Sequence, residues 1–397
     1  MRTVRLGEVC TWGSGGTPPR GRPDYFGDGV PWVSIADLND GVVVDVRESL
    51  TESGLAHCSA KVVPAGTLFV AMYGSIGKLG IASRDMCTSQ AIAHARPVDA
   101  VLDVRYLFHY LLAQRAALQA LGRGGTQMNI GQADLKAFPI PLPLLGDQRR
   151  IAAMLDQADA IRTVRRQVLA HLDTLPHAIF HDMFGTQEPT SALGECAEIQ
   201  GGLQVSARRR GTHDAPYLRV ANVYRDRLDL SEVKTIRATE AELRRTALAT
   251  GDLLFVEGHA NPMEVGRVAV WSSAIPGCVH QNHLIRARLD PTIAMPVFVS
   301  AWFNTDKGAA HFRRAAGTTS GLNTISASVV RSAPIPVPPL HVQHLFAART
   351  AEIAAQRTLV QTALARDDEL FAALQSRAFG TLTLGGRHDG ALPENWP

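Results

Sequence analysis

The pentapeptide PIPLP at residues 139–143 recurs as PIPVP at residues 334–338, which is 195 positions further along the chain. The same offset holds for the glutamine that follows each copy and for the Phe-Gly pair that ends each subsequent run of helix-forming residues: Gln148 and Gln343, Phe184-Gly185 and Phe379-Gly380. An offset that stays constant across these landmarks predicts that the chain contains one structural unit twice.

Shorter motifs upstream align in the same order, with small insertions. Three pairs of segments match: LGE at 6–8 and 193–195, PWVSIA at 31–36 and PYLRVA at 216–221, GTLFV at 66–70 and GDLLFV at 251–256. A chain duplicated in this way should present two similar surfaces related by an approximate two-fold axis, as a homodimer does. Such a molecule suits a two-fold object with unlike halves, for example duplex DNA that carries an asymmetric two-part site.

The composition is that of an ordinary globular protein. With 397 residues, 46% of them hydrophobic and 19% charged, the chain is long enough for two domains and gives no reason to expect long disorder. The formal net charge of +3 permits nucleic-acid binding without requiring it. Residues 1–20 lack the apolar core of a signal peptide, and no run of about 18 apolar residues occurs. We therefore expect a soluble, cytoplasmic protein with no membrane partner.

The cysteines are scattered along the chain and include no CxxC pair: Cys10, Cys58, Cys87, Cys196 and Cys278. This spacing predicts reduced thiols, and it favours neither a disulfide framework nor a zinc site.

Each half of the duplication combines a part with both strands and helices and a part that forms one long helix. Short apolar runs bounded by turn residues predict strands, and longer patterns predict helices: strands at 42–44, 67–70, 253–256 and 268–271, helices at 106–121 and 297–316. Strands and helices without regular alternation predict the α+β class. The expected boundaries are 1–143 for the first domain, 144–186 for the first helical region, 187–338 for the second domain, 339–380 for the second helical region and 381–397 for a C-terminal tail.

Apolar residues recur at three- and four-residue spacing in both helical regions: Ile151, Met154, Ala158, Ile161, Val168, Leu172, Leu175 and Ile179, then Phe346, Ile353, Val360, Ala363, Leu370 and Leu374. Polar residues interrupt the stripes: Arg165 in the first, Arg349, Gln356 and Asp367 in the second. We expect the two helices to pack on each other as an antiparallel coiled coil that holds the domains at a fixed separation. The alternative is that each stripe packs only on its own domain. Pro176 is expected to kink or end the first helix.

Sequence patterns typical of enzymes are incomplete in this chain. GSIGKL at residues 74–79 lacks the first glycine and the Ser or Thr of a phosphate loop, and NPME at 261–264 lacks the second proline and the aromatic residue of an amino-methyltransferase motif. EVK at 232–234, with Asp214 upstream, is a weak match to a metal-dependent nuclease site. We therefore predict a chain that is not an enzyme and holds no cofactor or metal of its own.

Polar residues beside predicted turns are the candidate DNA contacts. Asn, Gln and Arg can make paired hydrogen bonds to base edges, while Ser, Thr and Lys can meet bases or phosphates. The alternative for each residue is a turn or capping role. The candidates are Ser34, Asp37, Tyr73, Ser75, Lys78, Ser89, Gln90, Thr126, Gln127 and Asn129 in the first copy, and Arg219, Asn222, Glu257, His259, Asn261, Gln281, Asn282, Thr319 and Asn323 in the second.

These motifs occur twice in the same order, and in this the chain resembles the specificity subunit of type I restriction-modification systems. The resemblance rests on the LGE openings, the Pro-aromatic segments, the strands after Gly66 and Gly251, the turn at 74–80, the segment QNHLI at 281–285 and the two blocks from Pro-Ile-Pro to Phe-Gly. It implies two target-recognition domains that each read one half of a bipartite site in double-stranded DNA, and two helical regions that set the spacing.

The resemblance also implies partners. Two methyltransferase subunits would dock on the helical regions and supply the S-adenosylmethionine chemistry, and restriction subunits would supply cleavage driven by ATP in the presence of magnesium. Two other readings stay open at this point: a stand-alone duplicated binding module for a protein or glycan, and an enzyme fragment with methyltransferase or nuclease chemistry in the chain itself.

Overall fold

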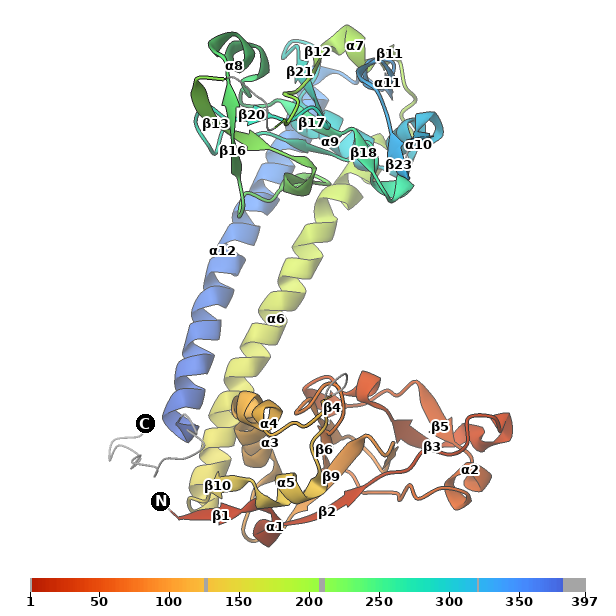
Figure 1. Cartoon of the computed structure of the whole chain (residues 1–397), viewed down its shortest axis with the longest axis vertical. Helices are drawn as coiled ribbons and strands as arrows, with labels where there is room; N and C mark the ends of the chain where they lie inside the picture. Colours follow the sequence, from red (N-terminus) through yellow and green to blue (C-terminus); the bar gives the residue numbers. More distant parts are fainter. Residues whose placement is uncertain (1, 125–127, 207–210, 320, 381–397) are drawn as a thin grey trace. The chain divides into compact units, whose positions relative to one another are not determined.

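The computed structural model describes residues 2–124, 128–206, 211–319 and 321–380, and the chain divides into two compact units (Figure 1). Unit 1 comprises residues 1–166 and 362–397, and unit 2 comprises residues 167–361. The division cuts both long helices, α6 (Leu145–Phe184) and α12 (Leu340–Phe379), which each run for 40 residues. Each unit therefore holds one mixed globular part and one half of each helix.

Unit 1 is built on a five-stranded sheet with the order β2-β9-β6-β7-β4, and a smaller sheet with the order β5-β3-β8. The strands are β2 (Cys10–Ser14), β3 (Phe26–Val33), β4 (Gly41–Val43), β5 (Glu48–Leu50), β6 (Leu68–Ala71), β7 (Leu79–Ala82), β8 (Cys87–Thr88) and β9 (Ile92–Pro97). The α-helices of the globular part are α1 (Leu6–Val9), α2 (Glu52–Ala56), α3 (Val104–Ala113), α4 (Arg115–Ala120) and α5 (Gln132–Ala137).

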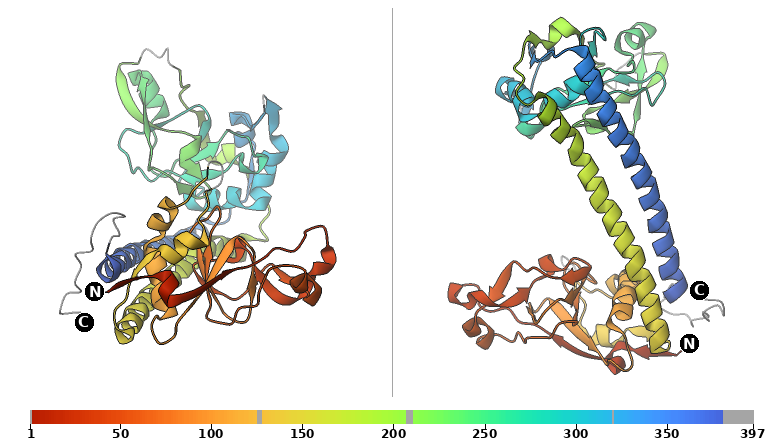
Figure 2. Two further views of the ribbon diagram at one scale, coloured as in Figure 1. Left: turned by 60° about the horizontal axis from the view of Figure 1, so that its bottom comes forward. Right: turned by 180° about the vertical axis from the view of Figure 1, so that it is seen from behind.

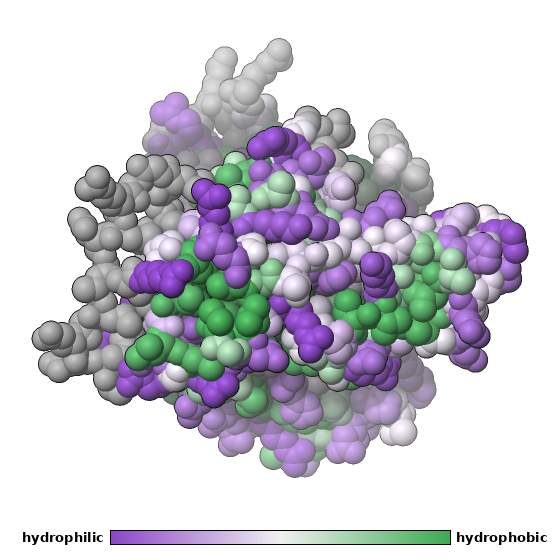
Figure 3. Space-filling model, turned by 90° about the horizontal axis from the view of Figure 1, so that it is seen from below, coloured by the Kyte–Doolittle hydropathy of each residue, from purple (hydrophilic) through white to green (hydrophobic). Residues whose placement is uncertain are grey.

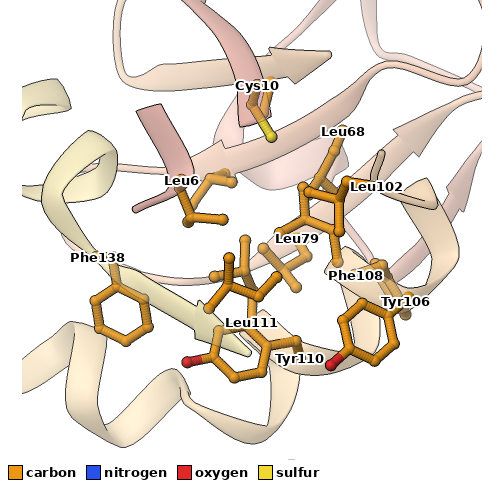
Figure 4. Packing of buried hydrophobic residues seen from close by; sticks show 14 of the residues in the cluster. Leu6, Cys10, Leu68, Leu79, Leu102, Tyr106, Phe108, Tyr110, Leu111 and Phe138 are labelled. Carbon is orange, nitrogen blue, oxygen red and sulfur yellow. The ribbon is translucent and has the colours of Figure 1, made fainter. Parts of the chain in front are cut away.

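The main core of unit 1 lies between the five-stranded sheet and the helices that follow it (Figure 4). Leu68 and Leu79 come from the sheet and face Tyr110 and Leu111 of α3, all fully buried. Phe379, near the end of α12, packs against the rings of Tyr106 and Tyr110 at centroid distances of 5.5 Å. The last turns of the described chain thus complete the core of the first unit.

Unit 2 repeats this plan with a four-stranded sheet, β12-β21-β17-β19, and two three-stranded sheets, β16-β13-β20 and β18-β23-β22. The strands are β12 (Ala197–Gly201), β13 (His213–Leu218), β16 (Lys234–Ala238), β17 (Leu253–Val256), β18 (Gly258–His259), β19 (Val268–Val270), β20 (Val279–His280), β21 (Leu284–Leu289), β22 (Gly317–Thr319) and β23 (Leu322–Thr324), with a separate hairpin of β14 (Val223–Tyr224) and β15 (Arg227–Leu228). The α-helices are α7 (Leu193–Cys196), α8 (Glu240–Thr246), α9 (Pro296–Asn304), α10 (Asp306–Ala315) and α11 (Ala327–Arg331).

The repeated Pro-Ile-Pro segments form equivalent strands in the two units. In unit 1, β10 (Pro139–Pro141) pairs antiparallel with β1 (Thr3–Arg5), and in unit 2, β24 (Pro334–Ile335) pairs antiparallel with β11 (Ser191–Ala192). A buried ring donates to the first carbonyl of each segment: the Tyr110 hydroxyl to Pro139 and the Trp302 indole to Pro334. The internal duplication and the α+β class are both confirmed.

The two long helices pack against each other in both units, as Figures 1 and 2 show. In unit 1, Arg162 of α6 pairs with Asp368 of α12 at 2.6 Å, and its guanidinium lies 4.1 Å from the centre of the Phe371 ring. In unit 2, Arg357 of α12 pairs with Asp173 of α6 at 2.6 Å. Because early residues of α6 meet late residues of α12, the packing is antiparallel, as expected.

The seam between the helices differs from a continuous apolar stripe. Arg165 and Asp367, each of which interrupts its own stripe, form an ion pair with each other. Ile161, Val168 and Leu370, which the periodicity assigns to the stripe, are exposed. Ion pairs as well as apolar contacts therefore stabilise the packing of the two helices.

Pro176 does not end α6, so the expectation that it ends the helix was wrong, while a kink at this residue stays a prediction. The helix continues to Phe184. Although a proline inside a helix removes one hydrogen bond and costs about 3 kcal/mol, the segments on both sides of Pro176 are anchored. Asp173 pairs with Arg357, and the rings of Phe180 and Phe184 pack against Phe346 at centroid distances of 5.4 and 5.7 Å.

Candidate nucleic-acid interface

In unit 1, the strand register brings several predicted contact residues to one edge. Strands β3 and β8 are parallel, with Val33 opposite Thr88, so the residues after both strands meet. Ser34 therefore lies beside Ser89, whose N–H donates to the carbonyl of Val33 at 2.9 Å. At the end of β6, the N–H of Met72 donates to the carbonyl of Ala91. We define candidate edge 1 as residues 34–37, 72–78, 89–91 and 128–130.

In unit 2, the same register brings the second set together. Strands β13 and β20 are parallel, with Leu218 opposite His280, and the N–H of Gln281 donates to the carbonyl of Leu218 at 3.0 Å. Arg219 therefore lies beside Gln281. At the end of β17, the N–H of Glu257 donates to the carbonyl of His283 at 3.0 Å. We define candidate edge 2 as residues 219–222, 257–264, 281–283 and 322–324.

Asp37 and Asn222 occupy equivalent turns, and their side chains are used inside those turns. The Asp37 carboxylate accepts from the N–H and the hydroxyl of Ser34 at 2.8 and 2.6 Å, and its side chain is only 3% exposed. The Asn222 amide accepts from the N–H of Arg219 at 3.0 Å and donates to two carbonyls. Because both side chains are buried and hydrogen-bonded, these two residues shape the turns that present Ser34 and Arg219.

The segment GSIGKL forms the turn between β6 and β7. Gly74 and Gly77 both have positive φ, 64° and 76°, which favours glycine because other residues are strained there. The Lys78 ammonium donates to the carbonyl of Ile35 at 3.3 Å and so ties this turn to the turn at 34–37. Ser75 and Tyr73 are exposed. Phosphate contact by this turn stays a prediction.

Two further predicted residues of edge 1, Asn129 and Gln90, lie in the described part of the chain. Asn129 bridges to Tyr73 and to Arg123 through its backbone and is exposed, as is Gln90 on the loop after β8. Thr126 and Gln127 lie outside the described residues.

In unit 2, strands β22 and β23 pair with each other, and β23 also pairs with β18. The Asn323 amide donates to the carbonyl of Ala260 at 3.0 Å, and the side-chain oxygen Oδ1 of Asn261 accepts from the N–H of Met263 at 3.0 Å. His259 Nδ1 accepts from the N–H of Asn261 at 3.0 Å. Thr319 belongs to β22, and its side chain is outside the described part. These bonds fix the loop at 257–264 against the hairpin.

Two glycines, which the sequence reasoning missed, pack directly beneath the edges. A β-carbon at Gly15 would lie 1.7 Å from the carbonyl oxygen of Thr88, and one at Gly202 would lie 2.3 Å from the carbonyl oxygens of His280 and Gln281. No side chain fits at these distances, so each position requires glycine. A sequence signal existed, since a Gly-Gly pair lies at the end of β2 and of β12, at 15–16 and 201–202.

Two residues of edge 2 pair with carboxylates. Edge 2 carries the pair Glu257 and His283 at 2.8 Å, and Arg219 pairs with Glu232 at 2.7 Å. Burial lowers the pKa of His280, directly below this edge, to about 4, so that imidazole is neutral near pH 7. His283 was not among the predicted contacts, although it follows Gln281 and Asn282 in the sequence.

The acidic residues that weakly suggested a nuclease site are engaged in ion pairs. Glu232 pairs with Arg219 and Lys234, and Asp214 lies 3.7 Å from Arg237. Among the described residues, no group of three or more His, Cys, Asp or Glu side chains is arranged to hold a metal ion. Within the same part of the chain, no helix has the length and apolar content that crossing a membrane requires.

Comparison with known proteins defines the class. The family model described as "Type I restriction modification DNA specificity domain" matches residues 1–173. The EcoKI specificity subunit of Escherichia coli K12 is 23% identical over 394 residues, which cover 90% of this chain and 83% of that protein. The StySPI specificity subunit of Salmonella potsdam is 23% identical over 386 residues, with the same coverage. The MjaIX specificity subunit of Methanocaldococcus jannaschii is 25% identical over 189 residues, 46% of this chain and 43% of that protein.

Solved structures share the fold over nearly the whole length. The S subunit of a type I system from M. genitalium aligns with a TM-score of 0.58 at 14% identity and covers 96% of both chains. A chain from a study of type I complex assembly and conformational transition aligns with a TM-score of 0.59 at 20% identity, covering 95% of this chain and 97% of that one. The first 173 residues thus match the type I restriction DNA specificity domain, and 90% of the chain is similar in sequence to specificity subunits of type I restriction systems. The resemblance inferred from the sequence is confirmed.

Proposed function

We propose that candidate edges 1 and 2 each read one half of a bipartite, asymmetric site in double-stranded DNA. One observation carries the proposal: the two edges have the same backbone frame but different side chains. Ser34 and Gln90 in edge 1 correspond to Arg219 and Asn282 in edge 2. Side chains of unlike chemistry on equivalent frames would select unlike base sequences.

We also propose that the exposed candidates make the direct contacts, while the buried ones hold the turns. Tyr73, Ser75, Gln90 and Asn129 are exposed in edge 1, whereas Asp37 is not. In edge 2, Gln281 and Asn282 are partly exposed, whereas Asn222 is buried. Loops carried on a rigid sheet are suited to this task because the frame fixes their position before DNA binds.

The long helices are the proposed docking surface for the methyltransferase subunits. In unit 1, Ile161 and Val164 follow each other at three-residue spacing on α6, and both are exposed, as is Leu370 on α12. Figure 3 shows a separate group of hydrophobic residues among polar ones on the underside of unit 1. Exposed apolar groups of this kind mark interaction surfaces more often than free surface.

The proposed complex acts in the cytoplasm and divides the chemistry among its subunits. S-adenosylmethionine would act on the methyltransferase subunits, and ATP and magnesium on the restriction subunits. Because α6 and α12 are each continuous over 40 residues, we propose that their length sets the spacing between the half-sites.

The experiment that tests the function is co-expression with a cognate methyltransferase subunit, followed by sequencing of the methylated bases. A split, asymmetric motif that disappears when this chain is omitted is the expected result. Replacing residues 1–140 with the equivalent part of another specificity subunit should change one half of the motif and leave the other half intact. A change in both halves would contradict independent reading.

A further inference from the structure

The pair formed by Glu257 and His283 is present in one copy of the duplication only. In unit 1, Met72 and Ala91 occupy the equivalent positions. The backbone N–H of Met72 donates to the carbonyl of Ala91 at 2.9 Å, and the backbone N–H of Glu257 donates to the carbonyl of His283 at 3.0 Å. Met72 is buried and Ala91 has no polar side-chain atom. The shared frame therefore forms without a hydrogen-bonded pair of side chains at this point.

Stability does not explain the pair. An ion pair at the surface contributes about 0–1 kcal/mol, because water screens it and two side chains must be ordered. The Glu257 and His283 side chains are 29% and 55% exposed. Since unit 1 builds the same frame with Met72 and Ala91, the frame itself does not require the hydrogen-bonded pair of Glu257 and His283.

The geometry gives the Glu257 carboxylate a fixed direction. Its backbone is held on both sides, by the carbonyl of His283 and by the N–H of Ile325, which donates to the Glu257 carbonyl at 2.9 Å. The His283 ring occupies one carboxylate oxygen, Oε2, through Nδ1 at 2.8 Å. Within the described part of the chain, no hydrogen bond to the other oxygen, Oε1, is present. Asn282 extends the group, with its amide nitrogen 3.5 Å from His283 Nε2.

A carboxylate oxygen accepts hydrogen bonds and cannot donate them, so it selects a base edge that presents an amino group. In the major groove, cytosine presents N4 and adenine presents N6, but adenine places the acceptor N7 beside its amino group. That acceptor would repel a carboxylate and instead suits an amide such as Asn282 or Gln281. Cytosine is therefore the base that the Glu257 carboxylate fits.

We propose that Glu257, oriented by His283, reads the amino group of a cytosine in the half-site bound by unit 2. The inference rests on the proposed function of edge 2. Glu257 is the specificity-determining residue and His283 is a positioning residue. Edge 1 has no equivalent, so this preference belongs to one half of the site.

The test uses the co-expressed complex and sequencing of methylated DNA, with Glu257→Gln and Glu257→Met as variants. Methionine is the residue that unit 1 already accommodates at this point, so the second variant protects against misfolding. Both variants should relax one C·G position in one half of the motif, with discrimination falling on the order of 10-fold. Glu240→Gln is the matched control, because Glu240 is exposed on α8, pairs with Arg244 and is not one of the residues of candidate edge 2.

The role of His283 is tested by rescue. His283→Ala should weaken the preference at that same position, and His283→Gln, which keeps a donor, should restore part of it. A wild-type motif without a C·G pair in the half read by unit 2, or an unchanged motif in both Glu257 variants, overturns the inference and leaves the recognition function standing. Failure of both Glu257 variants to assemble, while Glu240→Gln assembles, overturns it as well, because the pair would then be structural. Absence of any split motif in the wild type would instead contradict the proposed function.

Discussion

Gln148 and Gln343 make the same three backbone hydrogen bonds in the two units, near the starts of the two long helices. Each amide oxygen accepts one N–H and each amide nitrogen donates to two carbonyls: Asp103, Val101 and Pro143 for Gln148, and Met295, Ile293 and Pro338 for Gln343. Both side chains are completely buried. Each glutamine thus ties the first turn of a long helix to the segment before the helix α3 or α9.

Replacing Gln148 by alanine should lower the free energy of unfolding by about 2–3 kcal/mol, because buried backbone groups lose their partners. Gln157→Ala, an exposed position on the same helix, is the matched control and should stay within about 0.5 kcal/mol of the wild type. Urea unfolding monitored by circular dichroism gives both values. Equal effects at the two positions would show that the buried bonds contribute nothing beyond helix propensity.

Asp156 on α6 forms hydrogen bonds with α3, and these bonds should make the stability of the fold depend on pH. Burial opposes its ionisation, but hydrogen bonds from His109 and Arg105 outweigh burial and lower the pKa of Asp156 to about 2. A lowered carboxylate pKa stabilises the folded state above the ordinary pKa near 4, and that stabilisation is lost as pH falls from about 4 to about 2.

Asp156→Asn should therefore reduce stability at pH 7 by about 1–2 kcal/mol, a value discounted for partial exposure of the side chain. The difference from the wild type should shrink as the pH falls below 4. Denaturant midpoints measured at several pH values between 7 and 3 test this, with Asp182→Asn, an exposed position on α6, as the control. A difference that stays constant with pH would mean that Asp156 acts through packing and not through charge.

The ion pair of Arg165 and Asp367 should couple the two helices in unit 1. A double-mutant cycle with Arg165→Ala and Asp367→Ala should give a coupling energy of about 0.5–1 kcal/mol, since both side chains are partly shielded from water. The pair of Glu240 and Arg244 on α8 is more exposed and should give a smaller coupling. A coupling near zero for the first pair would show that the ion pair of Arg165 and Asp367 does not contribute to the packing of the helices.

Gly202→Ala should weaken recognition of the half-site bound by unit 2 and leave recognition of the half-site bound by unit 1 unchanged. The added β-carbon would collide with the carbonyl oxygens of His280 and Gln281, so the loop after β20 must shift, at a cost of about 1–3 kcal/mol. Gly201→Ala is the matched control, because nothing lies within 4 Å of its β-carbon position. Methylated-base sequencing should show one half of the motif weakened by Gly202→Ala and neither half by Gly201→Ala. Equal loss in both halves would indicate general destabilisation.

Much of the fold follows from the sequence because its signals are local or repeated. The Pro-Ile-Pro repeat marks β10 and β24, and the run after each copy predicts helices close to their observed bounds. The recurrence of Gln148 and Gln343 was visible, but their role was not, because the carbonyls of Val101 and Ile293 lie far away in sequence. Likewise, Arg165 and Asp367 each looked like a defect in a stripe, and only the antiparallel packing makes them partners.

The sequence indicates which types of residue the candidate site contains. It does not indicate which of these residues lie close together or which are buried. Gln281 and Asn282 stood out as amides beside a turn. Glu257 and His283 are separated by 26 positions, and only the register of β17 against β21 brings them together. Burial was equally hidden: Asp37 and Ser75 look alike as polar turn residues, yet one closes a turn and the other is exposed.

The division of both long helices between the units has a consequence for synthesis of the chain on the ribosome. Unit 2 is a continuous stretch, residues 167–361, whereas unit 1 needs residues from both ends of the chain. Phe371 and Phe379, which join the core around Tyr106 and Tyr110, are made only after all of unit 2 has been made. The usual order, in which the N-terminal domain finishes folding first, is therefore reversed: the part of the protein that is translated first is the last to have its core completed.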